Sequence, residues 1–132
     1  MRRNSVSWHD DNQTITRLEV HGDVTCAELF SAWHEELVLM RSVDHPVYSL
    51  NLFERRNGLL GNASIAKLVN FIRNNSADNL QMTVQVSEGA IMRSLLATVA
   101  RAMPHDVYVV SSLQEAEAII NAHKDAHFQN IR

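Results

Sequence analysis

The sequence predicts a single α/β domain built around one mixed β-sheet. Segments rich in β-forming residues alternate with segments whose apolar residues recur every three or four positions, and turn residues separate the two kinds. The length of 132 residues suits one domain. Helices between successive strands predict parallel strands with right-handed crossovers, and an N-terminal hairpin adds an antiparallel edge. The expected order of elements is β-β-α-β-α-β-α-β-α.

Five segments are expected to be strands. Residues 5–9 and 14–20 flank the turn residues 10–12, which predicts an antiparallel hairpin. The other three strands are the mostly apolar segment 47–53, expected to be central, the alternating segment 80–86, and the short segment 106–110, expected to be buried.

Two helices are expected in the first half of the chain. Thr25 offers an N-cap, with Glu28 at the spacing of a capping box, so the first helix should run from about Thr25 to Arg41. The second should begin near Asn62 or Ala63. The apolar stripe of the first helix is Cys26, Phe30, Trp33, Leu37 and Met40. Glu35 and Glu36 lie off that stripe, on what we interpret as a wet face.

The last two helices follow strands 80–86 and 106–110. Ser87 is expected to cap the third helix, and Ser112 the fourth. The expected buried face of the third is Ile91, Leu95, Val99 and Ala102 or Met103, and that of the fourth is Leu113, Ala116, Ile119 and Ile120. The domain core should span about residues 5–122, and 123–132 should be a polar, frayed tail.

Composition excludes several classes of protein. Hydrophobic residues make up 45% and charged residues 20%, as in ordinary globular domains. The formal net charge of −3 disfavours a general nucleic-acid binder. Cys26 is the single cysteine, so no intrachain disulfide can form, which fits a cytoplasmic protein. No apolar run approaches the roughly 20 residues that span a bilayer.

The segment after the expected central strand is the candidate site. Ligands of open α/β sheets bind beyond the carboxyl ends of strands, and a helix start attracts anions. The candidate anion- or partner-binding residues are Asn51, Arg55, Arg56, Gly58, Gly61 and Asn62, with Ser64 as a candidate for phosphorylation. In the simpler alternative, Asn62 or Ser64 caps the second helix and the arginines are solvated.

Catalytic and metal chemistry lack a supporting pattern. No Gly-x-Ser-x-Gly elbow or His-Glu-x-x-His pattern occurs, and the seven histidines do not form a ligand set. Cys26, in the first turn of a helix, is interpreted as a packed thiol. Met92, Leu96 and Met103 give the third helix an extended apolar surface, which could contact a second subunit, hold an apolar ligand, or be ordinary core. We expect no cofactor and no metal.

The order of elements from about Ser5 to Ala122 resembles the STAS domain of anti-sigma-factor antagonists and its SEC14-like relatives. More locally, Trp8, the helix that contains Trp33 and the segment 42–47 resemble a group of small stand-alone STAS-like bacterial proteins. In phosphorylatable STAS domains a kinase modifies a serine in the turn that opens the helix after the central strand. The resemblance places Ser64 nearest that serine, and Asn51 at the position of a strand Asp.

The resemblance implies a non-enzymatic regulatory or protein-interaction domain, switched by charge or phosphorylation near Ser64. Its expected partners are a kinase or an anti-sigma-like protein, with a second copy of the chain as a further candidate. The alternative is a sensor that binds a small anion or a lipid-like molecule, and an enzyme ranks below both.

Overall fold

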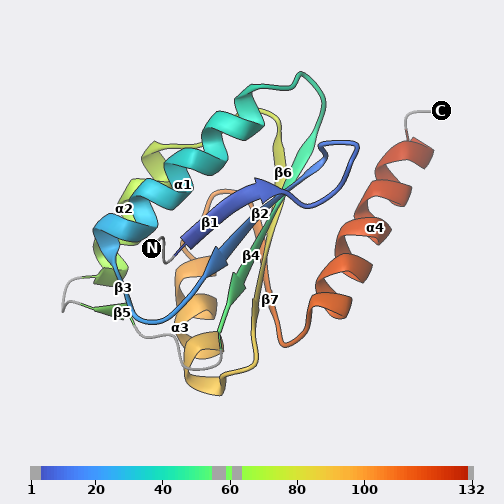
Figure 1. Cartoon of the computed structure of the whole chain (residues 1–132). Coiled ribbons are helices and arrows are strands. Elements are labelled where there is room, and N and C mark those ends of the chain that lie inside the picture. The colour runs from blue at the N-terminus through green and yellow to red at the C-terminus, as the bar shows by residue number, and fades with distance from the viewer. Residues whose placement is uncertain (1–3, 55–58, 61–63, 131–132) are drawn as a thin grey trace.

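The computed structural model describes residues 4–54, 59–60 and 64–130 (Figure 1). Its main sheet has the strand order β1-β2-β4-β6-β7, in which β1 and β2 are antiparallel and the other neighbours are parallel. The α/β class, the mixed sheet and the four helices are therefore confirmed. The elements are β1 (Asn4–Trp8), β2 (Ile15–Val20), β3 (Val24–Thr25), α1 (Cys26–Arg41), β4 (Val47–Phe53), β5 (Leu59–Leu60), α2 (Ser64–Asn74), β6 (Leu80–Ser87), α3 (Ala90–Ala100), β7 (Asp106–Val110) and α4 (Leu113–Asn130).

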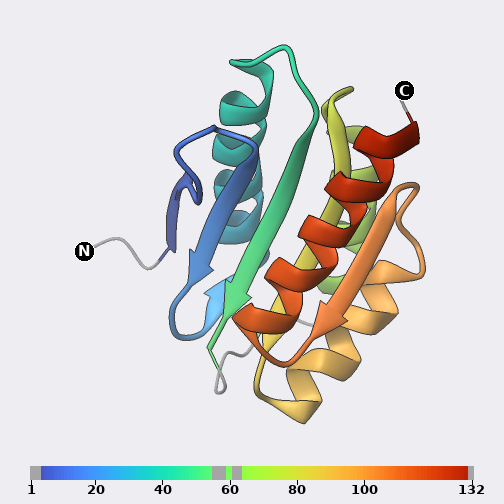
Figure 2. The ribbon, with the colours of Figure 1, turned by 90° about the vertical axis from the view of Figure 1, so that its right-hand side faces the viewer.

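The helices divide unequally between the two faces of the sheet. Helices α1, α2 and α3 cover one face, and α4 crosses the other (Figures 1 and 2). Strand β4 lies in the middle of the sheet, as expected for its apolar sequence. A second ladder, in which β3 pairs with β5, lies near the carboxyl end of β4, on the side of the sheet that α1 and α2 cover (Figure 1). The layer between the sheet and α1–α3 contains the cavity and the buried polar residues that are described in the next subsection.

Local sequence signals explain the first half of the fold. In the hairpin turn, the Asp10 carboxylate accepts hydrogen bonds from the backbone N–H groups of Thr14 and Ile15, both at 2.9 Å. At the start of α1, Thr25 and Glu28 form the expected capping box, with each side chain bonded to the other residue's backbone N–H. Because these side chains satisfy otherwise unpaired N–H groups, they set where β2 and α1 begin.

Helix α3 differs from the expectation in its cap and in its buried face. Gly89 is the N-cap, while Ser87 ends β6 and accepts a hydrogen bond from the Gly89 N–H at 3.2 Å. Met92, Leu96 and Val99 are buried, whereas Ile91 is 88% exposed. The helix begins two residues later than a cap at Ser87 would place it. Val99 is buried as expected, but the prediction was wrong at Ile91, since Met92 faces inward in its place.

The C-terminal part of the chain also differs. Strand β7 is the outermost strand beside β6 and is half exposed, not buried as expected. Ser112 accepts the expected capping bond from the Glu115 N–H at 3.1 Å. Helix α4 then continues through Asn130 instead of fraying from His123. His123 Nδ1 lies 2.7 Å from the Tyr48 hydroxyl, and Lys124 Nζ donates to Thr14 Oγ1 at 2.6 Å, so this part of α4 is held on the sheet.

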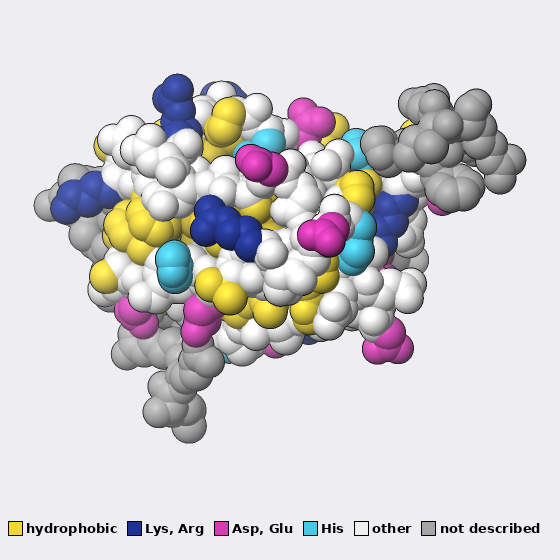
Figure 3. All heavy atoms as spheres, turned by 90° about the horizontal axis from the view of Figure 1, so that it is seen from above, with side chains coloured by type: hydrophobic (Ala, Val, Ile, Leu, Met, Phe, Trp, Pro, Cys, Tyr) yellow, Lys and Arg dark blue, Asp and Glu magenta, His cyan; other side chains and the backbone are white. Residues whose placement is uncertain are grey.

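The end of the molecule at which the parallel strands begin has a mixed surface. Seen from this end, side chains of Lys, Arg, Asp, Glu and His are interspersed with hydrophobic ones (Figure 3). Within the described part of the chain, no helix combines the length and the apolar character needed to cross a bilayer.

Candidate functional site

Buried polar side chains gather on one face of the sheet. On the other face, alternate strand residues such as Ile15, Leu50 and Val84 pack with Ala116 and Ile120 of α4 in an apolar cluster. Successive strand residues point to opposite faces, so the residues that flank these apolar ones in the strands lie under α1–α3. These neighbours are Thr16, Ser49, Asn51, Thr83, Gln85 and Ser87, and all are buried.

The strand register brings these polar residues together in rows. Ser49 is paired with Thr16 on one side and with Thr83 on the other. One pleat further along, Asn51 is paired with Gln85. The middle of this face therefore carries hydroxyl and amide groups where a buried parallel sheet usually carries aliphatic side chains.

Glu36 reaches these rows from α1 and is fully buried, with 0% of its surface exposed. Its Oε2 accepts hydrogen bonds from the hydroxyls of Thr16 and Ser49, both at 2.6 Å, and its Oε1 accepts one from Asn51 Nδ2 at 2.9 Å. The expectation that Glu36 lies on a wet face was wrong. The buried stripe of α1 runs through Leu29, Ala32, Trp33, Glu36, Leu37 and Met40.

Burial raises the pKa of the Glu36 carboxyl from 4.5 to about 7, although the hydrogen bonds from Ser49, Thr16 and Asn51 act in the opposite direction. Desolvation dominates, because the hydrogen-bond partners of the carboxylate among the described residues are the uncharged side chains of Thr16, Ser49 and Asn51. A carboxyl that titrates near neutral pH is typical of functional sites, although structural networks also produce such shifts.

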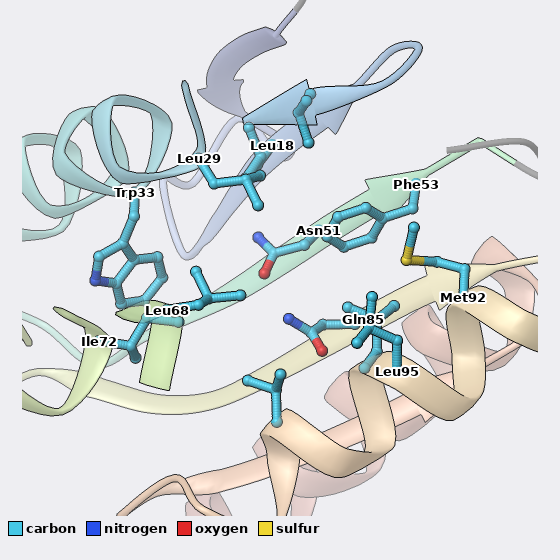
Figure 4. Close-up of a pocket in the computed structure, with 13 residues that line it drawn as sticks. Leu18, Leu29, Trp33, Asn51, Phe53, Leu68, Ile72, Gln85, Met92 and Leu95 are labelled. Atoms are coloured by element: carbon cyan, nitrogen blue, oxygen red, sulfur yellow. The ribbon is translucent and has the colours of Figure 1, made fainter. Parts of the chain in front are cut away.

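An apolar cavity lies beside this network, between the sheet and the three helices (Figure 4). Its volume is about 50 Å³. Leu29 and Trp33 of α1, Leu68 and Ile72 of α2, and Met92, Leu95, Leu96 and Val99 of α3 form its walls. Asn51 and Gln85 provide the amide groups of its floor. Apolar walls with a few polar groups are the usual composition of a small-molecule pocket.

The polar floor has unused hydrogen-bonding capacity. Gln85 is 9% exposed, and its Oε1 has no hydrogen-bond partner in the described part of the chain. A second cavity of about 30 Å³ shares Trp33, Asn51, Gln85 and other walls with the first and reaches His105. His105 Nε2 lies 2.9 Å from Thr83 Oγ1, and Nδ1 has no partner among the described residues. Burial lowers the pKa of His105, so neutral imidazole is favoured.

The residues predicted from the sequence fall in different places. Asn51 lies in the buried network, and Ser64 is the first residue of α2. Arg55, Arg56, Gly58, Gly61 and Asn62 lie outside the described residues. Met92, Leu96 and Met103, noted as an apolar surface of the third helix, all line one or other cavity. Sequence reasoning missed Glu36, Gln85 and Thr83.

Comparisons with protein-family models, with curated proteins and with solved structures found no match to this chain. Among the described residues, no three side chains of His, Cys, Asp or Glu are grouped as a metal site would require. The fold and the cavity define the class of this protein as an α/β domain with an apolar cavity that has a polar floor.

Proposed function

We propose that this domain binds a small, mostly apolar molecule in the cavity between its sheet and helices α1–α3. The observation that carries the proposal is the cavity itself, whose apolar walls meet the amide of Gln85, and the Oε1 of that amide has no hydrogen-bond partner among the described residues. A buried carbonyl oxygen without a partner costs about 1–3 kcal/mol. Natural domains leave few such groups, and a missing ligand or water is one explanation of them.

The size of the cavity limits the ligand. Its volume of about 50 Å³ exceeds the roughly 10–15 Å³ that one water needs, and is below the roughly 150 Å³ of an engineered cavity that takes up benzene. A compact molecule with few carbon atoms suits this space. Its apolar part would contact Leu68, Met92 and Leu96, and its polar part would face Asn51 and Gln85.

Xenon tests whether the cavity accepts an apolar guest. We expect xenon pressure to shift the NMR signals of the methyl groups of Leu68, Met92 and Leu96. Val99→Phe fills the cavity from α3 and should abolish these shifts, whereas Val38→Phe, on the exposed side of α1, should leave them unchanged. If Val99→Phe does not fold, Val99→Leu should weaken the shifts. Unchanged spectra of the original protein under xenon would contradict the proposal.

Native mass spectrometry of protein freshly purified from its own cells then identifies a retained ligand. We expect one bound molecule per chain, which Val99→Phe no longer retains. Such a ligand would make the domain a sensor or carrier of a small molecule. A cavity of about 50 Å³ takes a smaller ligand than the lipid-like molecules that the SEC14-like resemblance implies.

The second candidate is a STAS-type interaction domain without enzymatic activity, and the place of Ser64 favours it. Ser64 begins α2, and α2 follows the central strand β4 with the short strand β5 between them. A phosphate there would add about −1.5 to −2 charges at a helix N-terminus, where anions are stabilised. That change in charge would alter binding of a kinase, of an anti-sigma-like protein or of a second copy of the chain.

Phosphosite mapping tests this second function. After incubation with lysate of the source cells and ATP, we expect a phosphate on Ser64. Ser64→Glu should change partner binding, and Ser76→Glu, in the loop after α2, should not. Absence of modification together with unchanged binding by Ser64→Glu would remove the switch.

A further inference from the structure

Strand β1 forms one edge of the main sheet, and no strand pairs with its outer side in the described part of the chain (Figure 2). The His9 N–H donates to the Ile15 carbonyl at 2.7 Å, so the backbone of His9 faces β2. In an antiparallel ladder such residues alternate with residues whose backbone groups point the other way. The N–H and C=O groups of Asn4, Val6 and Trp8 therefore point toward the open edge.

An open edge of this kind pairs with another extended strand unless charge, proline or a bulge prevents it. Strand β1 has the sequence Asn-Ser-Val-Ser-Trp, which contains no charge and no proline, and its register with β2 is regular. The opposite edge of the sheet, β7, begins instead with the charged Asp106. The β1 edge is therefore the less protected of the two.

A second copy of β1 matches this edge in an antiparallel arrangement centred on Val6. Val6 then pairs with Val6 of the second copy, and Asn4 with Trp8, so each outward-facing residue exchanges two backbone hydrogen bonds with its partner. Ser5 and Ser7 lie opposite each other on the α4 side. Like charges do not meet anywhere in this register, and the contact is the same for both copies, as two-fold symmetry requires.

Helix α1 would pack against its own copy in the same arrangement. It lies over β1 and β2, since Leu29 packs in one cluster with Val6 of β1 and Leu18 of β2. Because strands are about 4.8 Å apart, a helix above the midline of β1 and β2 lies about 5 Å from the symmetry axis. The two copies of α1 would then be about 10 Å apart, close to the roughly 8–10 Å that separates packed helices.

The surface at this axis is hollow and partly apolar. A groove of about 250 Å³ lies between β1 and α1, and it is lined by Val6, His34, Glu35, Val38 and Leu39. Val38 is 57% exposed, although it is a large apolar side chain. The copy of α1 would fill this groove and remove Val38 from water, which favours association.

We propose that this chain forms a two-fold symmetric dimer in which the β1 strands pair, the two five-stranded sheets join into one, and α1 packs against its copy. This interface is separate from Ser64 and from the apolar residues of α3, and it does not depend on a ligand in the cavity. The contact is small, so we expect a dissociation constant in the micromolar range.

Sedimentation velocity from about 1 μM to about 1 mM protein measures the equilibrium between monomer and dimer. Hydrogen exchange followed by NMR over the same range locates the interface. The amides of Val6 and Trp8 should exchange more slowly as the dimer forms, because their N–H groups then donate to the second copy. A chain that stays monomeric at the highest concentration overturns the proposal, and so does a dimer in which these two amides gain no protection.

Two variants test the strand and the helix separately. Val6→Pro removes the central outward N–H, and proline is tolerated at an edge position whose N–H faces away from the sheet. Its dissociation constant should rise at least about tenfold, since two backbone hydrogen bonds across the axis are lost. Val38→Lys, which brings like charges together at the axis, should weaken the dimer by a similar factor. Ile91→Lys is the matched control on an exposed residue of α3 and should leave the dissociation constant unchanged.

If Val6→Pro does not fold, the comparison of Val38→Lys with Ile91→Lys still decides the question. A dimer that Val38→Lys leaves intact, or that Ile91→Lys disrupts, is formed through another surface, and either result overturns the proposal.

Discussion

The two faces of the sheet differ most at its centre. Under α4, strand residues such as Leu50 and Val84 form a continuous apolar cluster with Ala116 and Ile120. Under α1–α3, alternate residues of the same strands carry hydroxyl and amide groups around the buried carboxyl of Glu36. The α4 face thus stabilises the fold by burial of apolar area, whereas the other face gives up part of that stabilisation.

This difference indicates where function lies in the domain. A buried polar network that also borders a cavity has a stability cost that an all-aliphatic layer avoids. Strained or incompletely satisfied groups of this kind are expected at functional sites. Strand β4 contributes side chains to both faces. Substitutions at neighbouring residues of β4 therefore compare the stability that each face provides.

The largest expected effect is Leu50→Ala. Leu50 is fully buried in the α4-side cluster, so the change should lower the free energy of unfolding by about 2–5 kcal/mol. Ser49→Ala, the adjacent residue on the other face, should cost about 1 kcal/mol because Glu36 keeps its bonds from Thr16 and Asn51. Urea denaturation measures both, and equal losses would contradict the contrast between the faces.

The sequence predicted the five strands of the main sheet, the four helices and their order because these follow from local patterns, but not the two-residue strands β3 and β5. The capping box of Thr25 and Glu28 and the turn at Asp10 need contacts over only a few residues. The alternation in 80–86 predicted a strand correctly. It did not reveal that Thr83 and Gln85 face a helical layer instead of water, since alternation is the same in both cases.

Glu36 was missed for a related reason. Its place between Trp33 and Met40 fits a stripe of period 3.6, but a carboxyl in such a stripe is ordinarily assigned to its solvated edge. Its partners Thr16, Ser49 and Asn51 are 13 to 20 positions away in the chain. A buried carboxylate becomes acceptable only when such distant donors converge, and a single sequence does not display that convergence.

The pH dependence of stability is the next largest effect. The folded pKa of Glu36 is about 7, above the ordinary value of 4.5, because burial disfavours the charge. A group with a raised folded pKa stabilises the fold fully below its unfolded pKa, and this contribution is lost as the pH rises through the folded pKa. Between pH 4.5 and pH 8, Glu36 should therefore reduce stability by about 3 kcal/mol.

Glu36→Gln is the matched variant, since it keeps the shape of the side chain and cannot ionise. As the pH rises from 4.5 to 8, the free energy of unfolding of the original protein should fall relative to that of this variant. The contributions of other groups cancel in this difference. Chemical denaturation at half-unit steps of pH measures it. A difference that stays constant from pH 4.5 to pH 8 would show that Glu36 ionises normally and that the polar face is more hydrated than its contacts indicate.

The smallest expected effect concerns a polar contact at the margin of the apolar face. Tyr48 Oη lies 2.7 Å from His123 Nδ1, and Lys124 Nζ lies 5.6 Å from the Tyr48 ring centroid. Tyr48→Phe removes the hydroxyl and keeps the ring, so the lysine contact persists and the loss should be about 1 kcal/mol or less. Tyr108→Phe on the half-exposed strand β7 is the control and should have no measurable effect. A loss of unfolding free energy near that of Leu50→Ala would mean that this hydrogen bond holds α4 on the sheet more than apolar packing does. That result would contradict the contrast between the two faces.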